Sequence, residues 1–151
     1  MSLKREDNWY EYRDSDLSMR VPSYIRPKKA KGFFASRSKK DKSEPLLNIA
    51  VEFPNEDVTK AVWSTILGAK PTEWMGVTQR IVRRGKAAYL ADGLELLISS
   101  HGPGNVDVHD YHVLFLTGPR RIHAMFVGRG DLNRFDELCR EIVSSIRVSP
   151  S

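Results

Sequence analysis

Two apolar runs separated by a short turn form the most regular pattern in the chain. Residues 113–116 and 122–127 are both apolar or nearly so, and they flank Thr117-Gly118-Pro119-Arg120. A Gly-Pro pair favours a turn, because glycine accepts a positive φ and proline has no N–H to donate to a neighbouring strand. Residues 106–127 are therefore predicted to form one long β-hairpin.

A turn centred on Gly118-Pro119 fixes which residues of this hairpin face one another. The predicted register pairs residues across the two strands as follows: Leu116 with Arg121, Leu114 with His123, and His112 with Met125. The apolar runs do not alternate with polar residues, which predicts that both faces of the strands are covered. A sheet covered on both faces needs helices on each side.

Two stretches carry apolar residues at helical spacing. The first follows Asn55, an expected N-cap, and ends at Gly68. Its predicted apolar stripe consists of Val58, Ala61, Val62, Thr65 and Ile66. The second follows Asp131 as N-cap. Its stripe is the longest in the chain: Leu132, Phe135, Leu138, Cys139, Ile142, Val143 and Ile146.

The rest of the chain is predicted to form strands and loops. The predicted strands are two short ones around Asp14-Ser15-Asp16 within residues 9–21, then 33–35, 46–53, 75–82 and 87–99, the last interrupted at Asp92-Gly93. The predicted turns and loops are residues 26–31, 36–43, Arg83-Arg84-Gly85-Lys86 and Gly102-Pro103-Gly104-Asn105. Together these elements predict an α+β fold, a central antiparallel sheet flanked by helices as an α/β/α sandwich.

Length and composition predict one domain. The chain has 151 residues, and we expect residues 1–8 to be a disordered or expression-derived start, 9–148 the single domain and 149–151 a tail. No apolar run approaches the ~20 residues of a membrane-spanning helix. The single cysteine, Cys139, excludes an internal disulfide and a cysteine-rich zinc site, and its place in the last apolar stripe predicts a buried thiol.

The positive charge of the chain is concentrated in one segment. The formal net charge is +5, and residues 26–42 carry eight Lys or Arg side chains against one acid, Asp41. The predicted partner-binding residues of this basic segment are Lys28, Lys29, Lys31, Phe33, Phe34, Arg37, Lys39 and Lys40. Such a segment suits an acidic protein, an anionic lipid surface or a nucleic acid. The alternative is a solvated loop whose two phenylalanines enter the core.

The second candidate site is a histidine pair in the hairpin. Because side chains alternate along a strand, Asp110 and His112 share one face, and His109 and Tyr111 the other. In the predicted register His112 and His123 form a diagonal pair across the strands, close enough to share a metal or a proton, with Asp110 nearby. The alternative is that these histidines are structural, since a catalytic zinc site needs three protein ligands.

Motifs for catalysis are missing from the sequence. It contains no G-x-S-x-G elbow, no phosphate-binding glycine loop and no H-E-x-x-H. We therefore predict no catalytic residue and no cofactor. Three classes remain open: a protein-binding accessory domain, a metal-dependent or acid–base enzyme that uses the histidine face, and a nucleic-acid binder that uses the basic segment.

Three short segments of the sequence resemble the PsbP-like fold family, to which the Mog-type proteins also belong. The chain opens with Tyr12-Arg13-Asp14-Ser15-Asp16 and Met19-Arg20-Val21-Pro22, it carries the glycine turn Arg84-Gly85-Lys86-Ala87, and it closes on a helix followed by Ser145-Ile146-Arg147-Val148. The resemblance implies a noncatalytic domain that binds or assembles other proteins. Relatives of this kind are secretion-related chaperones or the soluble parts of exported bacterial lipoproteins. No partner-binding residue is carried over from the family, because its contact surfaces are not defined by a motif.

The start of the chain leaves the location open between two alternatives. Met1-Ser2-Leu3 runs directly into charged residues without an apolar signal region. This suits a cytoplasmic protein, or a mature domain whose export signal has been removed. The resemblance to exported family members favours the second, an exported or periplasmic protein.

Overall fold

The computed structural model describes residues 9–23, 25–30, 33–38, 46–70, 73–74, 77–102 and 106–149. Between residues 26 and 46 only the backbone of the strands is described. No helix in these ranges combines the length and the apolar character needed to cross a membrane.

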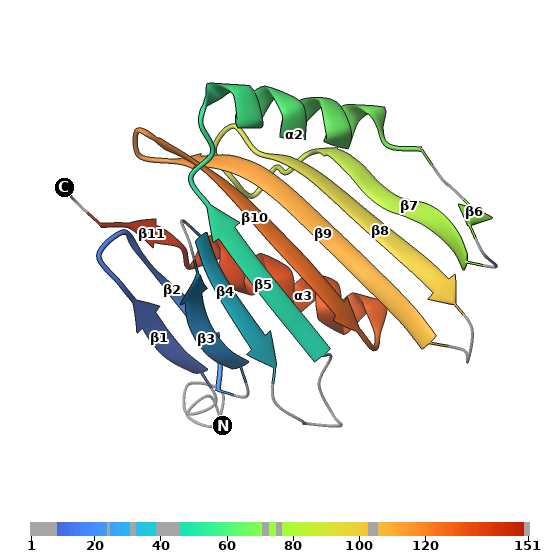
Figure 1. Cartoon of the computed structure of the whole chain (residues 1–151), viewed down its shortest axis with the longest axis horizontal. Coiled ribbons are helices and arrows are strands. Elements are labelled where there is room, and N and C mark those ends of the chain that lie inside the picture. Colours follow the sequence, from blue (N-terminus) through green and yellow to red (C-terminus); the bar gives the residue numbers. More distant parts are fainter. Residues whose placement is uncertain are drawn as a thin grey trace.

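Eight antiparallel strands form the main sheet, which Figure 1 shows face on. Their order across the sheet is β3 (Ile25–Ala30), β4 (Phe33–Ser38), β5 (Leu46–Glu52), β10 (Arg120–Arg129), β9 (Val106–Thr117), β8 (Leu94–Gly102), β7 (Val77–Lys86) and β6 (Glu73–Trp74). A smaller sheet has the order β1 (Trp9–Arg13), β2 (Leu17–Pro22) and β11 (Arg147–Val148). The predicted α+β class with a central antiparallel sheet is therefore confirmed.

The long hairpin lies in the middle of the main sheet with the predicted register. β9 and β10 pair Leu116 with Arg121, Leu114 with His123, and His112 with Met125. Gly118 takes a φ of 60° in the turn, a conformation that favours glycine. The turn chemistry thus fixed the register of the two central strands.

Helix α3 (Leu132–Ser144) covers one face of the sheet. Its N-cap Asp131 accepts a hydrogen bond from the Arg134 backbone N–H at 2.9 Å, as the sequence predicted. The predicted stripe is buried at Phe135, Leu138, Cys139, Ile142 and Val143. Four of them, all but Leu138, lie in one core cluster with inward-facing residues of the sheet, which include Ile49, Val51, Tyr111, Val113, Phe115, Ile122, Ala124 and Phe126.

Helix α2 (Glu56–Gly68) lies on the opposite face, at the side of the sheet formed by β7, β8 and β9. Its N-cap Asn55 accepts from the Val58 backbone N–H at 2.8 Å, as predicted. Its stripe is buried much less than the sequence predicted: Ile66 is buried and Val62 half-buried, but Val58, Ala61 and Thr65 are exposed. Helical spacing shows which residues share a face, whereas the depth of burial depends on how closely the helix meets the sheet.

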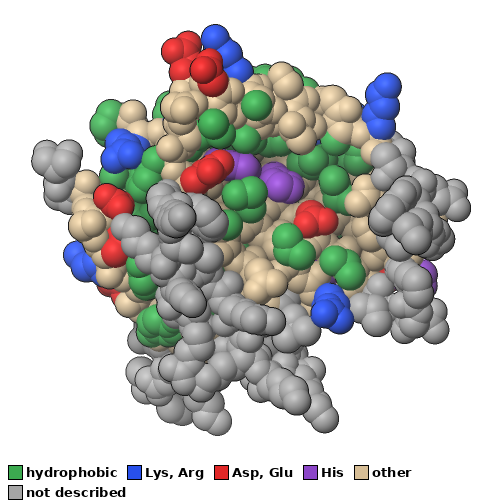
Figure 2. All heavy atoms as spheres, viewed as in Figure 1, with side chains coloured by type: hydrophobic (Ala, Val, Ile, Leu, Met, Phe, Trp, Pro, Cys, Tyr) green, Lys and Arg blue, Asp and Glu red, His purple; other side chains and the backbone are tan. Residues whose placement is uncertain are grey.

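The second face of the sheet is therefore covered only in part by the described residues. α2 packs on Leu94 and Leu96, with Ile81 and Ile98 beside them, in a small apolar cluster of its own. Figure 2 shows the rest of this face, with histidine side chains near its centre beside α2. The prediction that helices cover both faces of the central strands is correct for the α3 face and only partly correct for this one.

Three local predictions are wrong. Residues 36–38, predicted as the start of a loop, belong to strand β4. Residues 26–30, also predicted as a loop, belong to the outermost strand β3, where proline and lysine are tolerated because no other described strand pairs with its outer edge. The predicted turn Arg83-Arg84-Gly85-Lys86 lies within β7, and the chain turns at residues 87–93 instead. The Ala87 backbone N–H donates to the Gly93 carbonyl at 2.9 Å, and a Cβ on Gly93 would lie 2.8 Å from the Ala87 carbonyl oxygen, which leaves room only for glycine.

Several predictions concern residues that the structure does not describe. All or most residues of four predicted features lie outside the described ranges. They are the expected start, the expected tail, the loop residues 39–43 and 103–105, and the candidates Lys31, Lys39 and Lys40.

Replacing Phe135 by Ala should lower the free energy of unfolding by about 3–5 kcal/mol, because the side chain is fully buried at the centre of the α3 interface. Chemical denaturation monitored by circular dichroism measures the change. The matched control is Leu67→Ala on α2, where the side chain is 50% exposed and the expected loss is about 0.5 kcal/mol or less. Equal losses would contradict the packing described for α3.

Candidate functional site

The structure brings His112 and His123 together on the partly covered sheet face. Their ring centroids are 5.8 Å apart and the ring planes differ by 20°. His123 is buried, with 4% of its surface exposed, and His112 is half-buried. The diagonal arrangement follows from the register of β9 and β10, which the turn sequence determines.

The carboxylate that contacts this pair is Glu52, which the sequence did not indicate. Glu52 on β5 lies directly opposite His123 on β10, and its Oε1 is 2.8 Å from His123 Nδ1. The contact depends on the pairing of β5 with β10, two strands 71 residues apart at this point. Asp110 shares the strand β9 with His112 two residues away, and no contact joins it to either imidazole among those the structure describes.

Burial dominates the electrostatics of this face. It lowers the pKa of His112 to about 4, and the neighbouring His123 adds to the effect. Burial also raises the pKa of the Asp110 carboxyl, against a smaller opposing effect of His109. At neutral pH His112 is therefore uncharged.

The second ring nitrogen of His123 is the most unusual polar atom of this face. Nε2 is buried, and no described residue forms a hydrogen bond with it. When Nδ1 donates its hydrogen to Glu52, Nε2 keeps a free lone pair. In the described part of the chain, His, Cys, Asp and Glu side chains do not gather in groups of three or more able to hold a metal ion.

His109 faces the other side of the sheet and has a structural role. It is 1% exposed, its Nδ1 accepts from the Ser99 hydroxyl at 3.0 Å, and its Nε2–H donates to the Gly130 carbonyl at 2.7 Å. The ring packs on Phe135 with centroids 5.2 Å apart. His109 thereby ties β9 to the start of α3.

Beneath α3 lies a polar network that the sequence did not indicate. Arg83 donates from Nε to Glu95 at 2.9 Å and from both Nη atoms to Asp136 at 2.9 and 2.8 Å. The Tyr111 hydroxyl donates to Glu95 at 2.7 Å and lies 2.7 Å from the Tyr89 hydroxyl. Glu95 is 5% exposed, so Arg83 supplies the positive charge that a buried carboxylate needs.

Burial and pairing change the pKa values of two members of this network. The hydrogen bonds that Arg83 donates to Asp136 raise the pKa of Arg83; burial lowers it by less, and Glu95 raises it further. Burial, Tyr89 and Glu95 together raise the pKa of Tyr111. The sequence placed Arg83 in a turn, and therefore gave no reason to expect it opposite a buried carboxylate.

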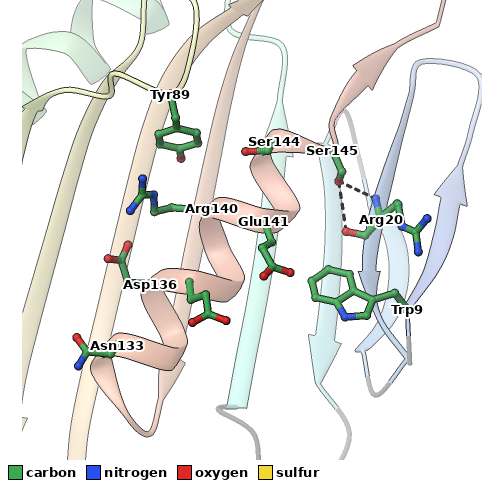
Figure 3. A pocket seen from close by; sticks show the side chains of 10 residues that line it. Trp9, Arg20, Tyr89, Asn133, Asp136, Arg140, Glu141, Ser144 and Ser145 are labelled. Atoms are coloured by element: carbon green, nitrogen blue, oxygen red, sulfur yellow. Dashed lines mark hydrogen bonds between the residues drawn. The ribbon is translucent and has the colours of Figure 1, made fainter. Parts of the chain in front are cut away.

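A surface groove runs along the outer side of α3 above this network, with a volume of about 810 Å³. Figure 3 shows Tyr89 at one side of α3 and Trp9 and Arg20 of the small sheet at the other. The helix contributes Asn133, Asp136, Glu137, Arg140, Glu141 and Ser144, and Ser145 follows it. We call this the α3 groove.

Two contacts hold the walls of the α3 groove in place. The Ser145 hydroxyl oxygen accepts from the Arg20 backbone N–H at 2.8 Å, which joins the end of α3 to β2. On the other side, the Arg140 guanidinium lies over the Tyr89 ring, 5.0 Å from its centroid. The groove therefore has aromatic and arginine side chains at defined positions.

The basic segment lies at the edge of the main sheet. Lys28 and Lys29 are on β3, and Phe33, Phe34 and Arg37 are on β4. The backbone register sets Phe33 against Glu52 of β5, and Arg37 against Asn48. The side chains of the segment are outside the description, so its expected role in binding stays a prediction.

Cys139 is fully buried in α3, as predicted from its place in the apolar stripe. Burial raises the pKa of its thiol well above the ordinary value, which keeps it in the unreactive protonated form.

Comparison with solved structures shows which known fold the chain has. No family model and no curated protein matches the chain. Among solved structures, it is similar to cyanobacterial PsbP (CyanoP) from Synechocystis sp. PCC 6803, with a TM-score of 0.51, 13% identity, and coverage of 94% of this chain and 93% of that one. It also aligns with LpqN of Mycobacterium tuberculosis, a protein involved in cell envelope biogenesis, with a TM-score of 0.45, 10% identity, and coverage of 97% and 94%. The chain has a PsbP-like fold.

Acid should destabilise the protein partly through His112. Its pKa is about 4 in the folded chain against 6.5 for the unperturbed group, so the unfolded chain takes up the proton first. The stability that depends on neutral His112 is complete above pH 6.5 and is lost as the pH falls toward 4. The loss of unfolding free energy over this interval should be smaller in His112→Gln, by up to about 3 kcal/mol. Denaturation at several pH values measures it, with exposed His101→Gln as the control, and identical pH profiles of wild type and His112→Gln would refute it.

Removing the cation of the buried network should be costly. Arg83→Met leaves Glu95 buried without its partner, and should lower the free energy of unfolding by about 3 kcal/mol, the low end for buried pairs because Arg83 itself is 33% exposed. The neighbouring Arg84→Met, at an exposed position, should cost less than about 1 kcal/mol. Adding Glu95→Gln to Arg83→Met should restore part of the loss. A double variant no more stable than Arg83→Met alone would show that the charge of Glu95 is not the cause.

Proposed function

We propose that this chain is a noncatalytic accessory domain that binds another protein through the α3 groove. The observation that carries the proposal is the set of side chains that line the groove. Two aromatic residues, Trp9 and Tyr89, and two arginines, Arg20 and Arg140, meet there around one helix. Tryptophan, tyrosine and arginine are the residues most enriched at the energetic centres of protein interfaces.

The rigidity of the groove supports this role. Asp136 on its floor is held by two hydrogen bonds from Arg83, and Ser145 at its end is tied to β2. A surface whose side chains are already fixed loses less conformational entropy when a partner binds. The Arg83 network therefore serves the groove as well as the core.

The charges of the groove favour a partner of mixed charge. Its rim carries both arginines together with Asp136, Glu137 and Glu141. Charges of both signs in fixed positions select the orientation of a partner more than they attract one sign of charge. A segment with alternating acidic and basic side chains around an apolar anchor fits this pattern.

The basic segment is a second contact surface in this proposal. Its described residues lie on β3 and β4, and β3 is the outermost described strand on this side of the main sheet. Lysines and Pro27 on an edge strand discourage pairing with a further strand, so contacts there would be made by side chains with an acidic partner surface. The PsbP-like fold agrees with the partner-binding role that the resemblance in sequence implies.

The test is recovery of a partner by the full chain from an extract of its source cells, compared between charge-reversed variants. Arg20→Glu/Arg140→Glu should reduce the recovered partner about tenfold or more, because substitutions at interface centres cost about 2 kcal/mol or more. The matched control Lys60→Glu/Lys70→Glu changes the net charge equally, at exposed positions of α2 and the residues after it.

A protein partner recovered equally by both double variants would refute binding through the groove. Recovery of nucleic acid in place of a protein would favour the alternative interpretation of the basic segment.

A further inference from the structure

The histidine pair on the other face of the sheet has no part in the α3 groove. Its distinguishing feature is the buried Nε2 of His123, which has no hydrogen-bond partner among the described residues. A buried polar atom without a partner is destabilising, and in folded proteins such atoms are rare unless they serve a ligand, an ion or water.

The fold sets the position of the His123 ring between its neighbours. Its strand neighbours on both sides, β9 and β5, hold the ring between His112 and Glu52. Glu52 accepts the hydrogen bond from Nδ1–H, so in the neutral ring the lone pair is on Nε2, the nitrogen without a partner among the described residues. This is the arrangement of a metal-binding histidine, whose outer nitrogen donates to a carboxylate while the inner one faces the ion.

The distance to His112 suits a shared ion. With metal–nitrogen bonds of about 2.0–2.1 Å and N–metal–N angles of about 90–120°, two imidazoles on one ion have ring centres roughly 4.5–5.5 Å apart. The observed separation of 5.8 Å is only slightly longer. A shared ion therefore requires a small movement of the half-buried His112 ring.

We propose that His112 and His123 bind one divalent transition-metal ion of the kind that prefers imidazole, namely Cu²⁺, Ni²⁺ or Zn²⁺, with Glu52 orienting His123. Two protein nitrogens leave the remaining coordination positions to water. Such a site is independent of the α3 groove, so either proposal can fail without the other.

The test is isothermal titration of the full chain, with any affinity tag removed, with CuCl₂, NiCl₂, ZnSO₄ and MgCl₂ near neutral pH. Binding should be tightest for Cu²⁺, weaker for Ni²⁺ and Zn²⁺, and absent for Mg²⁺, which prefers oxygen ligands. His112→Ala and His123→Asn should each abolish the high-affinity step. Glu52→Gln should weaken it about 10–100-fold, since the amide oxygen can still accept from Nδ1–H but the negative charge that strengthens this orienting contact is lost.

The matched control is His101→Ala, which removes an exposed histidine at the end of β8 and should leave binding unchanged. Circular dichroism establishes that each variant folds, and if His123→Asn does not, the half-buried His112→Ala decides. Line broadening of the His112 and His123 ring signals by Cu²⁺ gives a second readout of the same site. Wild-type binding no tighter than millimolar, or equal binding by wild type and His112→Ala, would overturn the proposal.

Discussion

Burial of one face of α3 against β9 and β10 is the interaction on which the rest of this structure depends. Phe135, Cys139 and Ile142 lie in the same core as Tyr111 and Phe126 of the central hairpin. Each large side chain buried in this way contributes roughly 1.5–3 kcal/mol before conformational entropy is subtracted. Because the helix is held on its inner side, its outer side can present polar groups, with Trp9 and Tyr89 of neighbouring segments beside them, without any need to stabilise the fold.

The two faces of the sheet are used differently as a consequence. The α3 face is closed, and its polar residues, Glu95 and His109, are all paired with partners from neighbouring elements. Among the described residues, α2 covers the opposite face over β7, β8 and β9, and His112 on this face is only half-buried. It is on this face that His123 Nε2 is buried without a partner among the described residues.

Much of the architecture follows from short stretches of sequence. The Gly118-Pro119 turn sets the register of the central hairpin, and Asn55 and Asp131 set where the two helices begin. The stripe from Phe135 to Val143 identifies the helix that covers the core. Local signals failed where they were ambiguous: Arg83-Arg84-Gly85-Lys86 resembles a turn, but the close approach of Gly93 to Ala87 places the turn further along the chain.

The candidate sites divide in the same way. The sequence determined that His112 and His123 share a face of the sheet, since a turn and the alternation of a strand are local properties. Only the tertiary structure decided that Glu52 contacts His123, that Arg83 lies between Glu95 and Asp136, and that Trp9 and Tyr89 border one groove. Each of these contacts joins elements that are distant in the chain, and their pairing is set by the packing of the whole core, which local pattern does not encode.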